Sequence, residues 1–232
     1  SQVMISVGAA TGFKSEAERT LARLQLIQRL QSLERFTRVD GSFAAGNVLV
    51  LGATLREGDR LEPAWLAPDG LLERVVRRRG LLEFRSVHPE SDTLVAKGET
   101  PEGYEPLSQA LAAGATRRIL VGRVPVADLT SSNVTEATVK FEAPGEFARI
   151  GVAFDAAGTR SLAAFTRTNV GQLIAVVLDG QLVMAPRVNE AIAGGRCEIT
   201  GQFSETEARA LSAAVRHPLP LSLQVLTTTI TG

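Results

Sequence analysis

Side chains that could perform catalysis are few in this sequence, and none stands in a pattern typical of a reaction centre. The two histidines, His88 and His217, each precede a proline, and no HExxH motif or paired imidazole spacing is present. A serine nucleophile would need a G-x-S-x-G turn or a serine–lysine pattern, and the chain has neither. We therefore expect no enzyme, no metal site and no cofactor, and we assign no catalytic or cofactor-binding residue.

Acidic residues and the single cysteine also have structural interpretations. The pairs Glu16/Glu18 and Glu205/Glu207 fall where helices are expected to begin, and the helix dipole favours negative charge in the first turn. We interpret both pairs as helix-capping groups and not as an acid–base dyad. Cys197 cannot form a disulfide within the chain, and we expect it to be a small, buried packing residue.

Apolar residues near the predicted hairpin at 173–185 offer the one candidate binding surface. Leu182, Met184 and Ile192 could line a groove for extended peptides, but apolar strand residues more often face a core, so we favour the core interpretation. The residues that would contact a bound peptide are therefore left unassigned. The basic run at 77–79 is interpreted as the cationic last turn of a helix.

Composition narrows the class of protein. The chain has 232 residues, of which 44% are hydrophobic and 22% charged, and its formal net charge is zero. Counterion release needs an excess of positive charge, so nucleic acid is not an expected partner. The sequence contains no run of about 18 apolar residues, the length needed to cross a bilayer. Either a targeting or anchoring segment has been removed, or the chain never had one.

The first third alternates predicted strands and helices. Residues 1–8 and 47–55 read as strands, and a long amphipathic helix is predicted between them at 14–35, with a capping box formed by Ser15 and Glu18. The expected buried face of this helix is Ala17, Leu21, Leu24, Ile27 and Leu30.

A second helix at 63–79 is predicted, interrupted at 68–70 and ended by Gly80, and a strand at 81–87 follows it. This order favours an α+β sandwich with helices on one face of a sheet.

Residues 88–115 are rich in proline, glycine, glutamate and serine, so we expect a short hairpin near 93–97 and little other regular structure. Strands are predicted at 118–124, 134–141 and 147–154, with a turn at Pro144–Gly145 before the last of them.

The last third carries the sharpest local signals. Asp155 follows an apolar strand and is a good N-cap for a helix that buries Leu162, Phe165 and Val170. Asp179 and Gly180 form a strong hairpin signal, because both central residues of such a turn must accept positive φ. After a strand at 196–200, a capping box at 204–207 opens a further helix, and a strand at 221–230 closes the chain. The resulting order, β-α-β-β-β-α-β, is close to a ferredoxin-like unit with one extra strand.

These segments, taken in order, resemble the first large extracytoplasmic domain of the SecD family, a component of the bacterial Sec translocase. The resemblance covers residues from about 80 to 226, and before residue 80 only the order of elements is similar. The matching residues are Leu82–Arg85, Phe154 and Asp155 with Gly158 and Phe165, Thr168–Gly171, Ala175–Gly180, Ala185–Pro186, Ile199–Gly201, Phe203 and Ser204 with Glu207 and Ala208, and Leu219–Leu221.

The resemblance implies a two-part α+β domain on the outer side of the cytoplasmic membrane. A ferredoxin-like base would comprise residues 1–87 with 217–232, and an inserted α/β head would comprise residues 88–216. It also implies binding of unfolded preprotein during export, with a SecF-like subunit and the Sec channel as partners of a membrane-anchored protein. It transfers no catalytic residue, because the proton-carrying residues of the family lie in transmembrane helices.

Three departures from the family pattern keep an alternative open. The family usually has Arg-x-Gly-Ala-Leu-Pro before the last strand, where this chain has Arg216-His-Pro-Leu-Pro220. Only Val48-Leu-Val-Leu-Gly52 represents a usual Val-Glu-Leu-Pro-Gly segment. The glycine-rich segment that normally leads into the first strand is missing as well. The alternative is a stand-alone scaffold or interaction domain of the cell envelope that keeps the fold.

Overall fold

The computed structural model describes residues 1–45, 48–111, 114–141 and 147–231, and it divides into two units that are described separately. The first unit consists of Ser1–Gly80 with Thr206–Gly232, and the second of Leu81–Glu205. The turn expected at Pro144–Gly145 lies outside the described residues. Among the described residues, no helix combines the length and the apolar character needed to cross a membrane.

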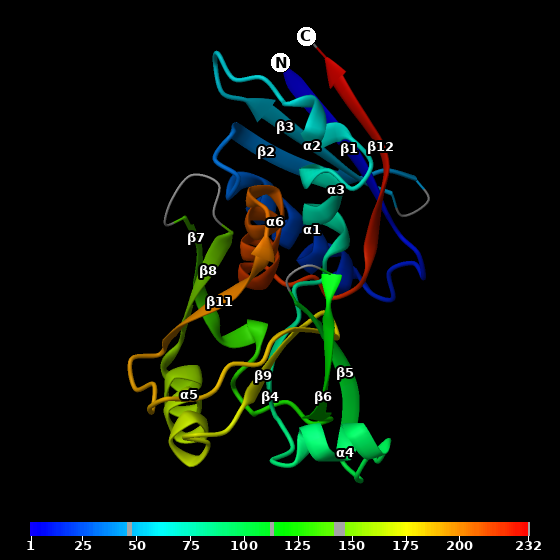
Figure 1. The fold of residues 1–232 in the computed structure, drawn as a ribbon. Coiled ribbons are helices and arrows are strands. Elements are labelled where there is room, and N and C mark those ends of the chain that lie inside the picture. The colour runs from blue at the N-terminus through cyan, green and yellow to red at the C-terminus, as the bar shows by residue number, and fades with distance from the viewer. Residues whose placement is uncertain (46–47, 112–113, 142–146, 232) are drawn as a thin grey trace. The chain divides into compact units, whose positions relative to one another are not determined.

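The first unit contains one four-stranded antiparallel sheet in the order β12-β1-β3-β2 (Figure 1). With β12 as its fourth strand, this order is that of a ferredoxin-like fold, in which a helix connects the first two strands and a third lies between them. The elements of the unit are β1 (Gln2–Ala9), α1 (Glu16–Gln31), β2 (Phe36–Phe43), β3 (Leu49–Leu55), α2 (Pro63–Leu66), α3 (Leu71–Arg77), α6 (Glu205–Arg216) and β12 (Leu223–Thr231).

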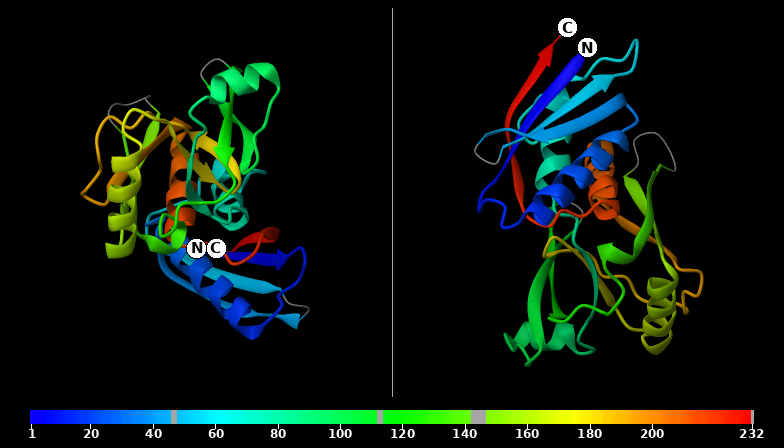
Figure 2. Two further views of the ribbon diagram at one scale, coloured as in Figure 1. Left: turned by 90° about the horizontal axis from the view of Figure 1, so that it is seen from below. Right: turned by 180° about the vertical axis from the view of Figure 1, so that it is seen from behind.

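Only one face of this sheet is fully covered. Burial alternates along β3, so every second side chain from Leu49 to Leu55 is buried, as expected when helices pack on a single face. The helices α1, α3 and α6 all contribute side chains to that core, among them Leu26, Val75 and Ala210. The strands β1 and β12 are neighbours, which brings the two ends of the chain together (Figure 2).

A buried arginine holds the helix ends of the first unit. Arg29, on α1, is 0% exposed. Its guanidinium donates to five backbone carbonyl oxygens: those of Val75, Arg78, Arg79, Ala214 and His217, at 2.5–3.3 Å. These carbonyls lie at the C-terminal ends of α3 and α6, where oxygens lack helical partners and the dipole favours positive charge. One side chain therefore caps two helices.

The second unit contains three small antiparallel sheets, in the orders β10-β9-β4, β11-β8-β7 and β5-β6. Its elements are β4 (Leu82–Ser86), α4 (Ser91–Lys97), β5 (Tyr104–Ala110), β6 (Thr116–Gly122), a 3-10 turn (Ser131–Asn133), β7 (Val134–Lys140), β8 (Ala148–Phe154), α5 (Ala156–Thr168), β9 (Ile174–Leu178), β10 (Gln181–Met184) and β11 (Arg196–Phe203).

Several local predictions are confirmed in this unit. Asp155 caps α5 by accepting a hydrogen bond from the Gly158 amide at 2.8 Å, and that bond lowers the pKa of the Asp155 carboxyl. The hairpin between β9 and β10 turns at Asp179 and Gly180, whose φ angles are 50° and 79°. All five residues of β9 are buried, as a continuous apolar strand requires.

The prediction of one ferredoxin-like unit in the last third is wrong. The order of elements is as expected, but the strands belong to three different sheets, and only β12 joins the four-stranded sheet of the first unit. The α+β class with a ferredoxin-like part is confirmed. The boundaries of the two units, after Gly80 and after Glu205, differ from the predicted division at residues 87 and 216. The assignment of those ranges as base and head stays a prediction.

Three further predictions are corrected. On α1 the buried side chains are Ala22, Leu26, Arg29 and Leu30, whereas Leu21 and Leu24 are 43% and 48% exposed. Val170, expected to be buried, is 51% exposed because it lies beyond the last turn of α5. The third correction concerns segments whose secondary structure differs from the prediction: Phe36–Phe43 and Tyr104–Ala110 are strands, and Ser91–Lys97 is a helix and not a hairpin.

Candidate functional site

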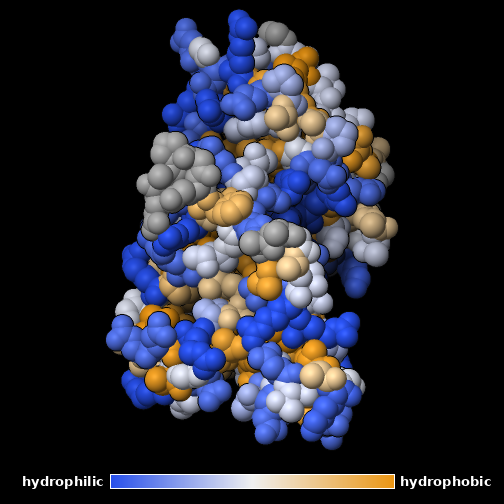
Figure 3. All heavy atoms as spheres, in the orientation of Figure 1, coloured by the Kyte–Doolittle hydropathy of each residue, from blue (hydrophilic) through white to orange (hydrophobic). Residues whose placement is uncertain are grey.

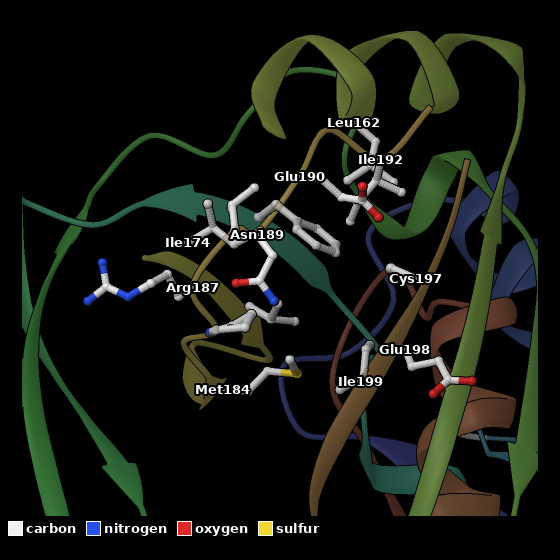
Figure 4. Close-up of a pocket in the computed structure, with 14 residues that line it drawn as sticks. Leu162, Ile174, Met184, Arg187, Asn189, Glu190, Ile192, Cys197, Glu198 and Ile199 are labelled. Atoms are coloured by element: carbon white, nitrogen blue, oxygen red, sulfur yellow. The ribbon is translucent and has the colours of Figure 1, made fainter. Parts of the chain in front are cut away.

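A pocket of about 330 Å³ in the second unit is the candidate site (Figure 4). It lies where β10, at the edge of one sheet, faces β11, at the edge of another. No backbone ladder joins these two strands. Met184 of β10 reaches β11 through its sulfur, which accepts a hydrogen bond from the Thr200 amide at 3.2 Å. The pocket therefore occupies a seam between two sheets whose edges are not paired there.

Apolar side chains from distant parts of the sequence form most of the wall. The residues that line the pocket are Phe84, Leu162, Ile174, Val176, Met184, Pro186, Arg187, Val188, Asn189, Glu190, Ile192, Cys197, Glu198 and Ile199. They come from β4, α5, β9, β10, β11 and the loop at 185–195. An apolar pocket with a few polar groups at its margin is the usual form of a binding site.

The loop at 185–195 is fixed to its surroundings by hydrogen bonds. The Val188 amide donates to the Gln172 carbonyl at 2.9 Å, and the Ile192 amide donates to the Thr166 hydroxyl at 2.9 Å. Thr166 is fully buried on α5, and its hydroxyl donates in turn to the Leu162 carbonyl at 2.7 Å. Because α5 holds the loop in this way, one wall of the pocket is formed before any ligand binds.

Two of the three charged residues of the lining point outward. Figure 4 shows the guanidinium of Arg187 and the carboxylate of Glu198 directed away from the apolar side chains. Glu198 pairs with Lys140 at 2.7 Å, and this hydrogen bond lowers the pKa of its carboxyl. Arg187 donates to the carbonyl of Gly171. The third, Glu190, has its carboxylate beside Ile192 (Figure 4), so the pocket offers apolar contacts together with the amide of Asn189 and this carboxylate.

The pocket contains no group prepared for chemistry at neutral pH. Burial raises the pKa of the Cys197 thiol to about 12, with the negative charge of Glu198 adding to the effect. The thiol stays protonated and is a poor nucleophile. No group of three or more potential metal ligands is found among the described residues. This arrangement can bind apolar groups, but it supplies neither an activated nucleophile nor a metal site.

The three residues singled out in the sequence do not share one role. Met184 and Ile192 line the pocket, as the groove interpretation requires. Leu182 is 5% exposed and packs in a core with Ile119 and Val177, so the core interpretation holds for it. Phe84 and Ile174 also line the pocket but carry no sequence signal for it, because they reach it only through the pairing of β4 with β9.

Neither histidine belongs to the pocket. The His88 ring packs edge-on against Tyr104, with 4.8 Å between ring centroids, and its Nδ1 accepts a hydrogen bond from the Glu90 amide. His217 belongs to the first unit. Burial lowers its pKa to about 4, and the positive charges of Arg216 and Arg29 act in the same direction. Both histidines therefore act as packing residues of the fold and not as parts of the pocket.

Across the face drawn in Figure 3, hydrophilic residues predominate and apolar residues appear singly or in small groups. This pattern is the usual one for a protein surface.

Comparison with known proteins gives a consistent result. The family model described as SecDF, P1 head subdomain, matches residues 107–220. Protein translocase subunit SecD of Desulfurispirillum indicum is 32% identical over 158 residues, covering 64% of this chain and 30% of that protein. The SecD subunit of Magnetococcus marinus is 31% identical over 163 residues, which cover 68% of this chain and 30% of that protein. The chain belongs to the SecD/SecDF family.

Solved SecDF structures share the fold. One, from work on SecDF as a membrane component that enhances protein export, aligns over 97% of this chain and 98% of its own, with a TM-score of 0.65 and 22% identity. SecDF in its super-membrane-facing form aligns over 98% of this chain and 30% of its own, with a TM-score of 0.69 and 21% identity.

The chain spans about 30% of the length of the SecD proteins that it matches. It therefore corresponds to one domain of SecD. SecD proteins are translocase subunits and not enzymes, so membership in the family confirms the prediction that the chain is not an enzyme.

Proposed function

We propose that this chain is an extracytoplasmic domain of a Sec translocase accessory subunit, and that its pocket holds apolar segments of preprotein during export. The observation that carries the proposal is the apolar seam between β10 and β11 in a member of the SecD/SecDF family. In this proposal the domain works on the outer side of the cytoplasmic membrane, with a SecF-like subunit and the Sec channel as partners. The first unit acts as base and the second unit as head in this proposal.

An unfolded preprotein suits this pocket because backbone pairing and apolar contacts recognise a peptide without reading its sequence. Both flanking strands are at sheet edges, so each has backbone groups that an extended peptide can pair with. The wall supplies aliphatic, aromatic and thioether contacts, and methionine adapts to side chains of different shapes. Such a site accepts many preproteins, as a translocase requires.

The size of the pocket implies weak binding. Burying one large aliphatic side chain contributes about 1.5–3 kcal/mol, and part of this is offset by the cost of ordering the peptide. A pocket of about 330 Å³ has room for few side chains. We therefore expect dissociation constants nearer to about 1 mM than to about 1 µM. Weak binding allows a moving chain to be released.

A charge placed in the pocket tests the proposal. Met184→Glu and Ile192→Glu each put a carboxylate into the apolar wall, and we expect each to weaken binding of a fluorescent apolar peptide at least about tenfold. The matched control is Val170→Glu, which alters an exposed apolar residue of the same unit outside the lining and should leave binding unchanged. Equal binding by all three variants would contradict the assignment of the pocket.

Crosslinking in the export reaction tests the larger claim. A photoreactive residue at position 192 should crosslink to a preprotein stalled in the Sec channel, and one at position 170 should not. If position 192 crosslinks to no exported chain while the pocket still binds peptide in solution, the stand-alone scaffold becomes the better description.

A further inference from the structure

Glu190 brings a carboxylate to the apolar pocket without any partner for its charge. The residue is exposed, and among the residues that the structure describes no hydrogen bond or ion pair engages its side chain. Its carboxylate lies beside Ile192, within the group of side chains that line the cavity (Figure 4). A charge in this position is available to a ligand that enters the pocket.

The other two charged residues of the lining are already engaged. Glu198 accepts a hydrogen bond from Lys140 at 2.7 Å, so its charge is compensated. Arg187 donates to the carbonyl of Gly171, and Figure 4 shows its guanidinium on the opposite side of the lining from the Glu190 carboxylate. The uncompensated charge that the lining offers to a ligand is therefore negative, and it belongs to Glu190.

The backbone on both sides of Glu190 is anchored. The Val188 amide donates to the Gln172 carbonyl and the Ile192 amide donates to the Thr166 hydroxyl, both at 2.9 Å. Glu190 lies midway between these two anchors in the sequence. Its carboxylate is therefore kept at the pocket, and only side-chain rotations remain to be fixed when it pairs with a ligand.

We propose that the pocket selects apolar segments that carry a lysine or arginine close to the apolar residue, and that Glu190 recognises the basic side chain. This inference rests on the proposed function, because it refines which segments of an unfolded chain the pocket holds. The ammonium or guanidinium donates a charge-assisted hydrogen bond to the carboxylate. The aliphatic stem of the same side chain lies along the apolar wall. Glu190 thus adds a modest preference to recognition that otherwise tolerates many sequences.

The position of the basic residue in the bound segment should matter. In an extended peptide successive side chains point to opposite sides, and residues two positions apart lie about 7 Å from each other on the same side. A lysine two positions from the apolar residue in the pocket therefore points toward the same wall. A lysine one position away points away from that wall. Recognition should depend on this register and not only on the net charge of the peptide.

Three matched peptides test the preference. Each has one central leucine among serines and threonines. The first has lysine two positions from the leucine on each side, the second has lysine one position away on each side, and the third has glutamine in place of lysine in the first. NMR titration of the isotope-labelled chain measures such weak binding. The first peptide should bind about two- to fivefold more tightly than the other two, the range of an exposed ion pair. This advantage should shrink between about 0.05 M and about 0.5 M salt, because salt screens exposed charges.

Variants of the chain assign the preference to one carboxylate. Glu190→Gln should abolish the preference and leave binding of the glutamine peptide unchanged. Glu190→Lys should reverse it, so that the glutamine peptide binds more tightly than the first lysine peptide. The matched control is Glu102→Gln, which removes an exposed carboxylate of the same unit outside the lining and should leave the preference intact.

The outcomes separate this inference from the proposed function. Equal binding of the two lysine peptides, or of all three peptides, overturns the role of Glu190. So does a preference that Glu190→Gln retains, or one that Glu102→Gln also removes. If the glutamine peptide binds and Met184→Glu weakens its binding, the proposed function stands even where the preference fails. Binding of none of the three peptides overturns both.

Discussion

The buried guanidinium of Arg29 shows how a single side chain fixes the ends of two helices. An isolated buried charge is costly, but this one donates hydrogen bonds to five backbone carbonyl oxygens. Those carbonyls would otherwise lack partners at the ends of α3 and α6. The planar, five-donor guanidinium suits such a set better than a lysine ammonium, which has three donors.

Replacing Arg29 should therefore destabilise the first unit strongly. Arg29→Met leaves the carbonyls buried without donors, and we expect the free energy of unfolding to fall by about 3 kcal/mol or more. Arg29→Lys should lose less stability than Arg29→Met, because lysine keeps the charge and some of the hydrogen bonds. Urea denaturation measures the change. The control is Arg38→Met, which removes an exposed ion pair and should cost at most about 1 kcal/mol. Equal midpoints for Arg29→Met and Arg38→Met would contradict this role.

His217 should make stability depend on pH between about 4 and 6.5. Its pKa is about 4 in the folded chain, against an ordinary value of 6.5, so the folded state favours the neutral imidazole. Its contribution to stability is thus complete above pH 6.5 and is lost as pH falls toward 4, because the unfolded chain then binds the proton more readily. His217→Gln should lose less stability than the unmodified chain between pH 7 and pH 4.5 in urea titrations. Parallel losses would show that other groups account for the pH dependence.

At the scale of elements, Gly80 marks the point where the chain leaves the first unit. Its φ is +78°, and a Cβ at this position would lie 2.1 Å from the carbonyl oxygen of Ala214. Gly180 has a similar φ of +79°, but nothing lies within 4 Å of its Cβ position. Gly180→Ala should therefore cost about 1–2 kcal/mol from backbone strain alone. Gly80→Ala should cost clearly more, because the end of α6 must also move. Thermal denaturation of the two variants compares these costs, and equal midpoints would contradict the role of the contact.

The sequence predicted elements where local chemistry decides and failed where tertiary contacts decide. Caps and turns such as Asp155 and Gly180 depend on residues nearby, and both are confirmed. The strand β5 was missed because it contains Pro106, which an edge strand of a two-stranded sheet tolerates. On α1, two apolar stripes were possible, and the chosen one included Leu21 and Leu24. The stripe that is buried is the one containing Arg29, because only the fold brings carbonyl oxygens to that guanidinium.

At the scale of the whole molecule, the pocket was only partly predictable. Met184 and Ile192 were candidates because they are apolar and near a hairpin, but Leu182 had the same signal and is core. Whether a residue lines the pocket or the core depends on which strand edges meet. The sequence does not reveal that β10 meets β11, because a loop of unpredictable course separates them. The binding seam depends on sheet topology, whereas family membership could be inferred from motifs.

The two units differ in how the chain builds them, and this predicts how fragments behave. Leu81–Glu205 is one continuous segment with its own buried residues, so it should fold alone, with dispersed amide signals in NMR and cooperative unfolding. Residues 1–80 alone should not fold, because Ala210, Leu219 and Leu223 of its core come from beyond residue 205. Joining 1–80 to 206–232 should restore folding. Gly80 lies beside Ala214, and the nine helical residues from Thr206 to Ala214 span about 12 Å. A flexible linker of about ten residues, which spans about 17 Å, can therefore join Gly80 to Thr206. Folding of 1–80 alone would show that α6 and β12 are dispensable for that core.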